Sequence, residues 1–544
     1  MLAFSWRHQQ EKNKLITALP FLRHSIITDE RSAMKNLTRT LLWSLYLCAM
    51  SLNPLQAAET GNGIINVATI GEPPTLDPMA TTTDLVAMIS QHIFETLYAF
   101  NAKWDVVPLL AEKMPTISED GKIYDIPLRA NIPFHTGQIM TPADVVASLS
   151  RWLNIASRGK QVAPFIASVT AHGEHGVRIT LNRPYSPLLS LLAFNNSAAV
   201  IMPAALLSEP LTQYSGTGPY RLQAHVPDQY IQLVRFANYT PRSEPPDGFG
   251  GARRPLLREI RFVPVVDENT RLNGILSGQF DYADSLPPEK YPSLKNNAKA
   301  VPVFQQPFGL AVMVMNTRQG IMANQWIRQA VQAALNPQDM LLAAFGDPAF
   351  FSVEGALYPA NYVWHSGQGV ARYNQASPET AAALLKKGGY RGETVRILTS
   401  RQYEFHYKMA LVAAEYLKAA GMKVKLDIYD WATLTTRRAD PGLWDIFITH
   451  GPFPPEPILN SWMSDDYPGW WATPEKKRAV DAYISEPDVQ RRQALFAAIQ
   501  QLFYEQAPVY KVGNFNTLAA KARTLEHFTP SPWPFFWNVD TQQP

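Results

Sequence analysis

Two short segments in the C-terminal half combine aromatic rings with carboxylates, a mixture that suits the binding of a small organic molecule. The first is Tyr429-Asp430-Trp431, and the second runs from His450 to Pro457. Aromatic side chains bury a large apolar area at little entropic cost, and carboxylates can anchor a polar group. We therefore expect ligand contacts from Trp431, Asp430, Phe453, Glu456, Trp470, Trp471 and Tyr403.

The position of these segments in the expected fold also favours binding. Each follows an expected strand, at residues 423–428 and 445–449, and the carboxyl ends of strands in open α/β sheets face ligand crevices. The alternative for each tryptophan is a place in a domain core, and the sequence leaves that alternative open.

The common catalytic and metal-binding motifs are missing from the sequence. It contains no G-x-S-x-G, no H-E-x-x-H and no P-loop. His135, His406 and His450 stand far apart, whereas first-row metals usually need several converging ligands. We expect a binding protein with no enzymatic activity, no cofactor and no metal.

Residues 34–57 have the anatomy of a secretory signal peptide. A basic start at 34–39 precedes an apolar run at 41–50 that is too short to anchor the chain in a membrane. Small residues follow, and we expect cleavage after Ala57 or Ala58. Residues 1–33 are polar and precede this complete signal, so we expect that translation begins at Met34 or that the basic region is unusually long; the alternative is a folded N-terminal extension.

The single cysteine, Cys48, lies within this apolar run. Leu47 precedes it where a lipoprotein needs a small residue, so we expect a periplasmic protein without a lipid anchor and without thiols. The leader, residues 1–57, carries a net charge of +4, which leaves about −1 of the total +3 for the mature chain. The excess of positive charge therefore lies in the leader, and the charge of the mature chain does not indicate a nucleic-acid partner.

The chain of 544 residues is long enough for two to four domains. Alternating apolar and polar residues, caps and turn residues predict an α/β fold with several strands and helices along the mature chain. The expected strands lie at 64–70, 124–128, 177–181, 231–234, 260–264, 308–315, 395–398, 423–428 and 445–449, and the expected helices at 85–98, from 142, and at 324–335, 337–345, 377–387 and 405–420. Residues 248–255 read as a surface loop.

Residues 108–149 contain five motifs in a fixed order. They read P-x-L-A-E, D-G-K-x-Y, L-R, F-H-x-G and T-x-x-D-V-x-x-S. Thr141 caps the expected helix and Pro142 begins it. This pattern resembles the family 5 extracytoplasmic solute-binding proteins of peptide, opine and nickel ABC importers. Further matching segments are Thr75–Pro78, Phe94–Tyr98, Gly216–Tyr220, Arg271–Asp281 and Asn316–Asn336.

The resemblance implies a two-lobed periplasmic-binding-protein fold of the class II-like type, in a three-domain variant with an extra inserted domain. Domain I would be discontinuous, domain II the insertion and domain III continuous. Crossings near residues 300 and 516 would form the hinge. The implied ranges are 59–105, 218–300 and 517–544 for domain I, 106–217 for domain II and 301–516 for domain III.

The resemblance also implies a monomer that delivers a peptide-like or other small organic solute to an inner-membrane ABC permease. Peptide-binding members keep an aspartate four residues before the proline that corresponds to Pro457, where it pairs with the ligand α-ammonium. Phe453 occupies that position here, so we expect weak binding of unmodified di- and tripeptides. The alternatives are a degenerate member acting as a ligand sensor or chaperone, or a binder of opine, sugar or metal-chelate ligands.

Overall fold

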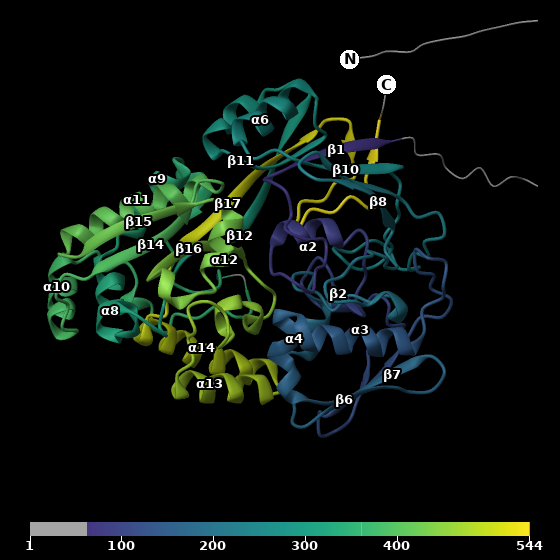
Figure 1. The fold of residues 1–544 in the computed structure, drawn as a ribbon, viewed down its shortest axis with the longest axis horizontal. Coiled ribbons are helices and arrows are strands. Elements are labelled where there is room, and N and C mark those ends of the chain that lie inside the picture. The colour runs from purple at the N-terminus through teal and green to yellow at the C-terminus, as the bar shows by residue number, and fades with distance from the viewer. Residues whose placement is uncertain (1–62, 361, 543–544) are drawn as a thin grey trace, which may run out of the picture. The chain divides into compact units, whose positions relative to one another are not determined.

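The structure, a computed structural model, describes residues 63–360 and 362–542 and has a mixed α/β architecture (Figure 1). Its largest element is an eleven-stranded sheet, in which β13 (Phe351–Ser352) pairs only with β17. The other ten strands lie across the sheet in the order β15 (Lys423–Tyr429), β14 (Thr394–Ser400), β16 (Ile446–Pro452), β12 (Ala300–Met315), β17 (Val509–Ala522), β11 (Tyr282–Leu286), β1 (Ile64–Thr69), β10 (Glu259–Pro264), β9 (Tyr230–Arg235) and β8 (Tyr220–Val226).

Two long strands, β12 and β17, run through both halves of this sheet. Residues 300–305 of β12 pair with residues 517–522 of β17, on the side where β17 adjoins β11. Residues 309–314 of β12 pair with residues 509–515 of β17, on the side where β12 adjoins β16. The register shifts between these two stretches, so both connections between the halves pass through a break in the strand pairing.

The helices beside β14 and β15 begin within one residue of the positions that the sequence predicts (Figure 1). Ser377 Oγ accepts the Thr380 backbone N–H at 3.1 Å, and Asn336 Oδ1 accepts that of Asp339 at 3.2 Å. These caps confirm the expected alternation of strands and helices after residue 324. The four helices are α8 (Gln325–Ala334), α9 (Pro337–Phe345), α10 (Pro378–Lys387) and α11 (Glu404–Ala419).

A second, four-stranded sheet lies within residues 116–181, next to α3 (Pro142–Ile155). The predicted start of α3 is confirmed, because Thr141 and Asp144 form a reciprocal capping box. The strands follow the order β4 (Thr116–Ile117), β5 (Ile123–Pro127), β7 (Gly176–Leu181) and β6 (Ile166–Ala171), and two short helices follow α3, namely α4 (Ser157–Val162) and α5 (Leu188–Ala193).

His135 joins two of the sequence motifs that lie far apart in the chain. Its backbone N–H donates to the Gly216 carbonyl at 2.9 Å, and its Nε2 lies 2.9 Å from the Gly218 carbonyl. The F-H-x-G turn is thereby held against the G-T-G-P-Y segment. His135 therefore has a structural role, because backbone groups of Gly216 and Gly218 contact both of its ring nitrogens.

One local expectation is wrong in the N-terminal part. The helix expected at 85–98 ends at Ser90, so α2 covers only Asp84–Ser90. The following residues instead bind the C-terminal segment: Gln91 Nε2 donates to the Trp533 carbonyl at 3.1 Å, and the Phe536 backbone N–H donates to His92 Nε2 at 3.0 Å. These tertiary hydrogen bonds outweigh the helical tendency of the local sequence.

The expected surface loop at 248–255 is also wrong, because much of it is buried. Arg253 Nη2 donates to the Phe249 carbonyl at 2.7 Å and lies over the Trp537 ring, 4.4 Å from its centre. The Glu95 carboxylate lies 3.7 Å from the same guanidinium. Pairing with Glu95 therefore compensates the burial of the Arg253 charge, and this polar segment can lie in the interior.

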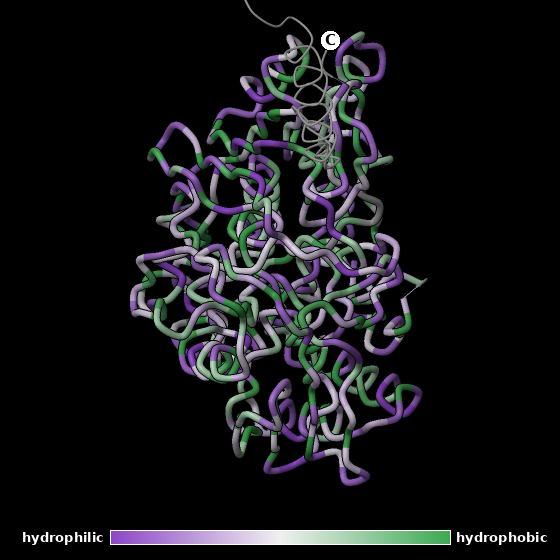
Figure 2. Tube along the Cα trace, turned by 90° about the vertical axis from the view of Figure 1, so that its right-hand side faces the viewer, coloured by the Kyte–Doolittle hydropathy of each residue, from purple (hydrophilic) through white to green (hydrophobic). Residues whose placement is uncertain are grey.

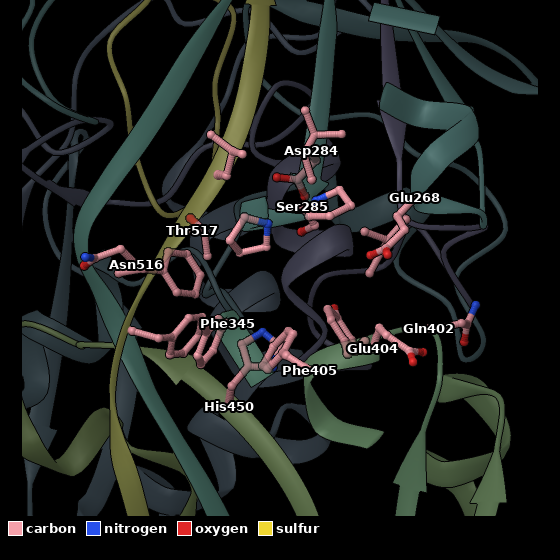
Figure 3. Close-up of a pocket in the computed structure, with 18 of the residues that line it drawn as sticks. Glu268, Asp284, Ser285, Phe345, Gln402, Glu404, Phe405, His450, Asn516 and Thr517 are labelled. Carbon is pink, nitrogen blue, oxygen red and sulfur yellow. The ribbon is translucent and has the colours of Figure 1, made fainter. Parts of the chain in front are cut away.

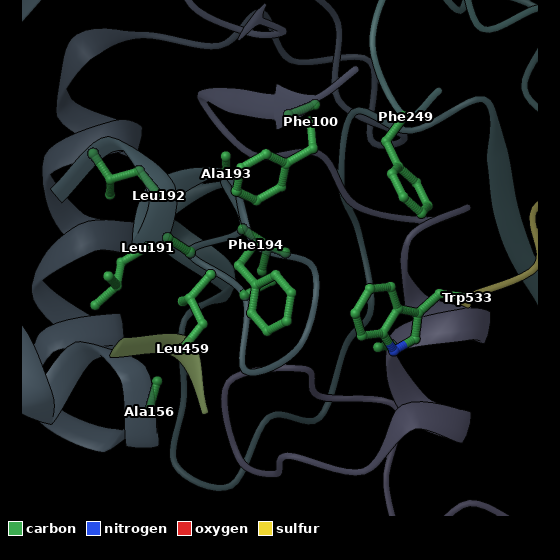
Figure 4. Packing of buried hydrophobic residues seen from close by; sticks show 14 of the residues in the cluster. Phe100, Ala156, Leu191, Leu192, Ala193, Phe194, Phe249, Leu459 and Trp533 are labelled. Atoms are coloured by element: carbon green, nitrogen blue, oxygen red, sulfur yellow. The ribbon is translucent and has the colours of Figure 1, made fainter. Parts of the chain in front are cut away.

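Apolar packing continues across the N-terminal half and meets the C-terminal segment (Figure 4). The Trp533 ring lies 5.2 Å from the Phe194 ring and 6.4 Å from the Phe249 ring, in edge-on and tilted arrangements. Hydrophilic residues gather in many of the outer loops (Figure 2). Trp533 and its neighbours thus tie segments that are distant in sequence.

The remaining helices are short or of moderate length. Among the described residues, no helix combines the length and apolar character needed to cross a membrane. Their bounds, with those of the short strands, are α6 (Glu268–Ser277), α7 (Tyr291–Lys295), α12 (Trp431–Arg437), α13 (Pro474–Ser485), α14 (Val489–Gln506), β2 (Tyr98–Phe100), β3 (Val106–Pro108), β18 (Leu525–Glu526) and β19 (Asp540–Thr541). The predicted signal peptide lies outside the described residues.

Candidate ligand-binding site

A cavity of about 860 Å³, including the part that is open to solvent, lies between segments from several parts of the chain. We call it the arginine cavity. Its charged lining residues are Arg158, Arg438 and Asp84, which give a formal charge of +1. Its other lining residues include Tyr403, Trp431, His450, Asn196 and Trp533.

The fold places Arg158 in this cavity through a close contact between α3 and α4. Arg158 is the second residue of α4, which turns directly after the end of α3. Gly159 permits this turn, because a Cβ atom there would lie 1.9 Å from the Trp152 carbonyl oxygen. Trp152 Nε1 in turn donates to the Ser197 carbonyl at 2.9 Å, which holds α3 against the cavity wall.

The Arg158 side chain is only 5% exposed, yet its guanidinium has no hydrogen-bond partner among the described residues. Its nearest aromatic contact is the Phe194 ring, 5.0 Å from the guanidinium carbon. Burial lowers the pKa of Arg158 to about 10, and the Asp84 charge opposes this shift. Arg158 is therefore a buried cation at neutral pH that keeps its hydrogen-bonding capacity for another molecule.

Asp84 is the negatively charged residue of this lining, and two hydrogen-bond donors fix its carboxylate. Its Oδ1 accepts Trp533 Nε1 at 2.8 Å and Asn196 Nδ2 at 2.9 Å. Burial raises the pKa of Asp84, and these hydrogen bonds and the Arg158 charge oppose the rise. Because both donors use the same oxygen, Asp84 also retains hydrogen-bonding capacity.

Aromatic residues and a second arginine come from the C-terminal half of the sheet. Tyr403 and Trp431 lie edge-on with ring centres 5.0 Å apart, and both line the arginine cavity. Arg438 donates to the Tyr467 hydroxyl at 3.2 Å and lies over the Phe447 ring. The cavity therefore combines two cations with apolar walls, a combination suited to an organic anion.

Two histidines meet at one wall of the arginine cavity. His406 Nε2 lies 2.9 Å from His450 Nδ1, which corrects the expectation that these residues are isolated. Strand β16 supplies His450 and helix α11 supplies His406, so 43 intervening residues separate the two in the chain. The Tyr403 ring lies 4.7 Å from the His450 ring.

A second pocket adjoins the arginine cavity and shares Asp84, Tyr403 and His450 with it. Figure 3 shows Asp284 and Ser285 on one side of this pocket, and His450 and Phe405 on the other. Its charged lining residues are Asp84, Glu268, Asp284, Glu289, Glu404, Arg271 and Lys408. Arg271 is occupied by backbone carbonyls, so the potential of this pocket is set mainly by carboxylates.

Only two of the seven expected ligand contacts, Tyr403 and Trp431, line the arginine cavity. Trp470 stacks on Trp444 with ring centres 5.7 Å apart, and Trp471 Nε1 donates to Gln506 at 2.6 Å. Both tryptophans are at least 90% buried. They occupy the core alternative that the sequence left open.

The two expected carboxylate anchors are occupied by the chain itself. Asp430 caps α12 and accepts the Thr433 backbone N–H at 2.8 Å. Glu456 is buried and accepts hydrogen bonds from Arg492 and Tyr483. We therefore no longer assign these carboxylates to the ligand, because each is already neutralised or bonded locally.

Phe453 is also buried, with the Tyr362 ring 5.6 Å away, and it borders a separate, wider groove rather than the arginine cavity. Sequence reasoning missed three lining residues of this candidate site, Arg158, Arg438 and Asp84, and also the contact that joins His450 to His406. No local signal distinguishes them, since each lies in an ordinary helix, strand or loop segment. Among the described residues, no group of three or more potential metal ligands converges.

A model of the bacterial extracellular solute-binding proteins, family 5, matches residues 105–470. The chain belongs to this family. The sequence resemblance is thereby confirmed, and the α/β periplasmic-binding-protein fold agrees with it.

Relatives of this family 5 protein are named for different ligands. It is 25% identical to a probable peptide ABC transporter periplasmic-binding protein, y4tO, of Sinorhizobium fredii, over 85% of this chain and 91% of that protein. It is 26% identical to the glutathione-binding protein GsiB of Pectobacterium atrosepticum, over 93% and 98%. The solved structure of AgaA from A. tumefaciens R10 with agropinic acid has a TM-score of 0.76 and 24% identity, covering 88% and 99%.

Proposed function

We propose that this protein is the periplasmic component of an ABC importer and captures a small organic acid, one carboxylate of which binds Arg158. The observation that carries the proposal is the buried guanidinium that has no hydrogen-bond partner in the described chain. Leaving a charge buried without a partner costs on the order of several kcal/mol. A carboxylate would remove this cost and match the planar guanidinium with two N–H···O bonds.

The remaining lining of the arginine cavity supports an acid with an apolar body. Arg438 adds a second positive charge, and Tyr403 and Trp431 supply aromatic walls. Two of the relatives are named for glutathione and agropinic acid, which both carry carboxylates. Simple peptides fit less well, because they carry a single carboxylate for the two arginines of this cavity.

Ligand capture would involve closure of two lobes around this cavity. We assign domain I to residues 59–105, 218–300 and 517–544, domain II to 106–217 and domain III to 301–516. Arg158 comes from domain II and Asp84 from domain I, whereas Arg438 comes from domain III. A ligand that touches all three binds the closed state better and shifts the population toward it.

Contacts between domains II and III support a closed conformation. Gln161 Nε2 donates to the Ile458 carbonyl at 2.9 Å, and the Ser186 backbone N–H donates to the Ile484 carbonyl at 2.7 Å. Figure 1 shows α13 beside α4 in this region. These contacts would break on opening, while β12 and β17 bend where their pairing is interrupted.

X-ray scattering tests the closure. A saturating ligand should reduce the radius of gyration, and an unchanged value at saturation would contradict the mechanism.

Export is tested separately: the sequence read by N-terminal sequencing of the periplasmic protein should begin at residue 58 or 59. The ligand itself should be recovered chemically unaltered after incubation, since we propose binding without catalysis.

The carboxylate contact is tested by thermal shift and calorimetry with three probes, namely glutathione, agropinic acid and the dipeptide Met-Leu. We expect stabilisation by glutathione or agropinic acid and a weaker effect from Met-Leu, because Met-Leu has only one carboxylate for Arg158 and Arg438. Amidation of the acid should weaken its binding. Arg158→Met should lower the affinity roughly 30-fold or more, since losing one partner of a buried charge pair costs about 2–5 kcal/mol.

Exposed Arg372→Met serves as the matched control, because it removes one positive charge from a residue that lines neither the arginine cavity nor the adjoining pocket. It should leave the affinity unchanged. Equal binding of an acid and its amide, or full affinity in Arg158→Met, would refute the carboxylate site.

A further inference from the structure

The histidine pair, His406 and His450, leaves one ring nitrogen without a partner at each end. The shared contact joins His406 Nε2 to His450 Nδ1 at 2.9 Å. His406 is fully buried, and its Nδ1 has no hydrogen-bond partner among the described residues. His450 has no second side-chain partner there either, but it is less buried and lines both the arginine cavity and the adjoining pocket.

The surroundings keep both rings neutral. Aromatic rings enclose the pair: the Phe405 ring lies 4.4 Å from the His406 ring, and the Trp431 ring lies 5.6 Å from it. Burial lowers the pKa of both histidines, that of His450 to about 3. Each neutral ring carries one proton, so a single proton occupies the shared contact.

Two proton arrangements satisfy the shared contact. In the first, His406 donates from Nε2, its Nδ1 is a bare lone pair, and His450 carries its proton on Nε2. In the second, His450 donates from Nδ1, its Nε2 is bare, and His406 carries its proton on the buried Nδ1. The two therefore differ in what is left buried at His406: a lone pair or an N–H group.

The unpartnered Nδ1 of His406 decides between them. A buried N–H without an acceptor is rare and costs more than a buried acceptor that lacks a donor. The nitrogen that a histidine protonates follows from the bond made by the other one. The first arrangement is thus favoured, and it leaves an N–H on the nitrogen of His450 that the chain does not use.

We infer that His406 is a positioning residue that holds His450 in its Nε2–H form, so that His450 donates a hydrogen bond to an acceptor oxygen of the ligand. The consequence for the ligand rests on the proposed function, because a carboxylate or carbonyl oxygen would be the acceptor. Arg158 and His450 line the same cavity and would then both act as donors. A group that needs a lone pair from the protein, such as a metal ion, is disfavoured at His450.

The proton position can be measured without any ligand. In the full chain labelled with ¹⁵N-histidine, we expect His450 to show a protonated Nε2 and an unprotonated Nδ1, with His450→Asn identifying the signals. In His406→Phe, which keeps a ring but removes the donor, the two nitrogens of His450 should become an averaged pair. His406→Gln should restore the wild-type pattern, because its amide nitrogen can donate in place of Nε2.

An unprotonated Nε2 at His450 in the wild-type spectrum would overturn the inference. With glutathione as the probe, His406→Phe should lose roughly tenfold or more in affinity, and His406→Gln should stay within about threefold of wild type. Equal affinity of the Phe and Gln variants would overturn the role in binding. Failure of the proposed function would show differently, as full acid affinity in Arg158→Met.

Discussion

Two buried arginines, Arg492 and Arg158, are treated very differently by this fold. Their exposed fractions are nearly equal, at 6% and 5%. Arg492 donates to the Glu456 carboxylate and lies over the Trp364 ring. The guanidinium of Arg158 has a ring contact with Phe194 and no hydrogen bond among the described residues. The Nε of each arginine lacks a hydrogen-bond partner among the described residues, but the chain supplies a carboxylate to Arg492 alone, and we propose that a ligand supplies one to Arg158.

The histidines repeat this contrast. In the core, His92 Nδ1 lies 3.0 Å from the Met88 carbonyl, and its Nε2 accepts the Phe536 backbone N–H at 3.0 Å. At the cavity, His450 uses one nitrogen for His406 and keeps the other. Burial alone therefore does not indicate a binding site in this protein; unused hydrogen-bonding capacity on residues that also line a cavity does.

The largest expected effect comes from breaking the completed pair. Glu456→Gln removes the charge that balances Arg492, so the free energy of unfolding should fall by about 3–5 kcal/mol. Urea unfolding measures this change. The double variant Glu456→Leu/Arg492→Met should be much milder, because no unpaired charge remains, and a double variant as unstable as Glu456→Gln would contradict the explanation.

Substitution of a core tryptophan should lower stability, whereas substitution of a cavity tryptophan should mainly lower ligand affinity. Trp470→Ala empties a buried site and should cost about 3–5 kcal/mol of unfolding free energy. Trp431→Ala should cost about 1 kcal/mol, because Trp431 is only half-buried, but it should weaken ligand binding. Thermal unfolding and calorimetry together test this, and unchanged affinity in Trp431→Ala would remove Trp431 from the site.

Acid should destabilise the protein partly through His92. Burial lowers the pKa of His92 from 6.5 to about 3, so below pH 6.5 the unfolded chain takes up a proton that the folded chain refuses. Stability is therefore lost as the pH falls, by about 2 kcal/mol for this group between pH 6.5 and 5. Urea unfolding at several pH values should show a smaller loss in His92→Gln than in wild type; equal slopes would contradict it.

The smallest effect is expected for the stability of Arg158→Met. Because the described chain supplies no hydrogen bond to the Arg158 guanidinium, replacing this side chain should leave the unfolding free energy within about 1 kcal/mol or raise it. Urea unfolding without ligand makes the measurement. A loss as large as that of Glu456→Gln would show that Arg158 has a partner in the folded chain and would weaken the comparison.

Much of the fold could be predicted because its signals are local. The caps Thr141 and Ser377 mark the starts of α3 and α10, and strand β5 follows its alternating pattern. Errors arose where distant segments intervene: residues 91–97 leave the helix to meet the C-terminal segment, and residues 248–255 enter the interior around Arg253.

The sequence by itself determined the family, most helix and strand positions, and two residues of the cavity wall, Tyr403 and Trp431. Tertiary structure alone decided which polar groups are free. Glu456 looks like an anchor until Arg492, 36 residues later, takes its charge. Arg158 looks ordinary until α4 buries it without a partner. Local patterns report backbone conformation, but the use of a donor or acceptor depends on residues that only folding brings together.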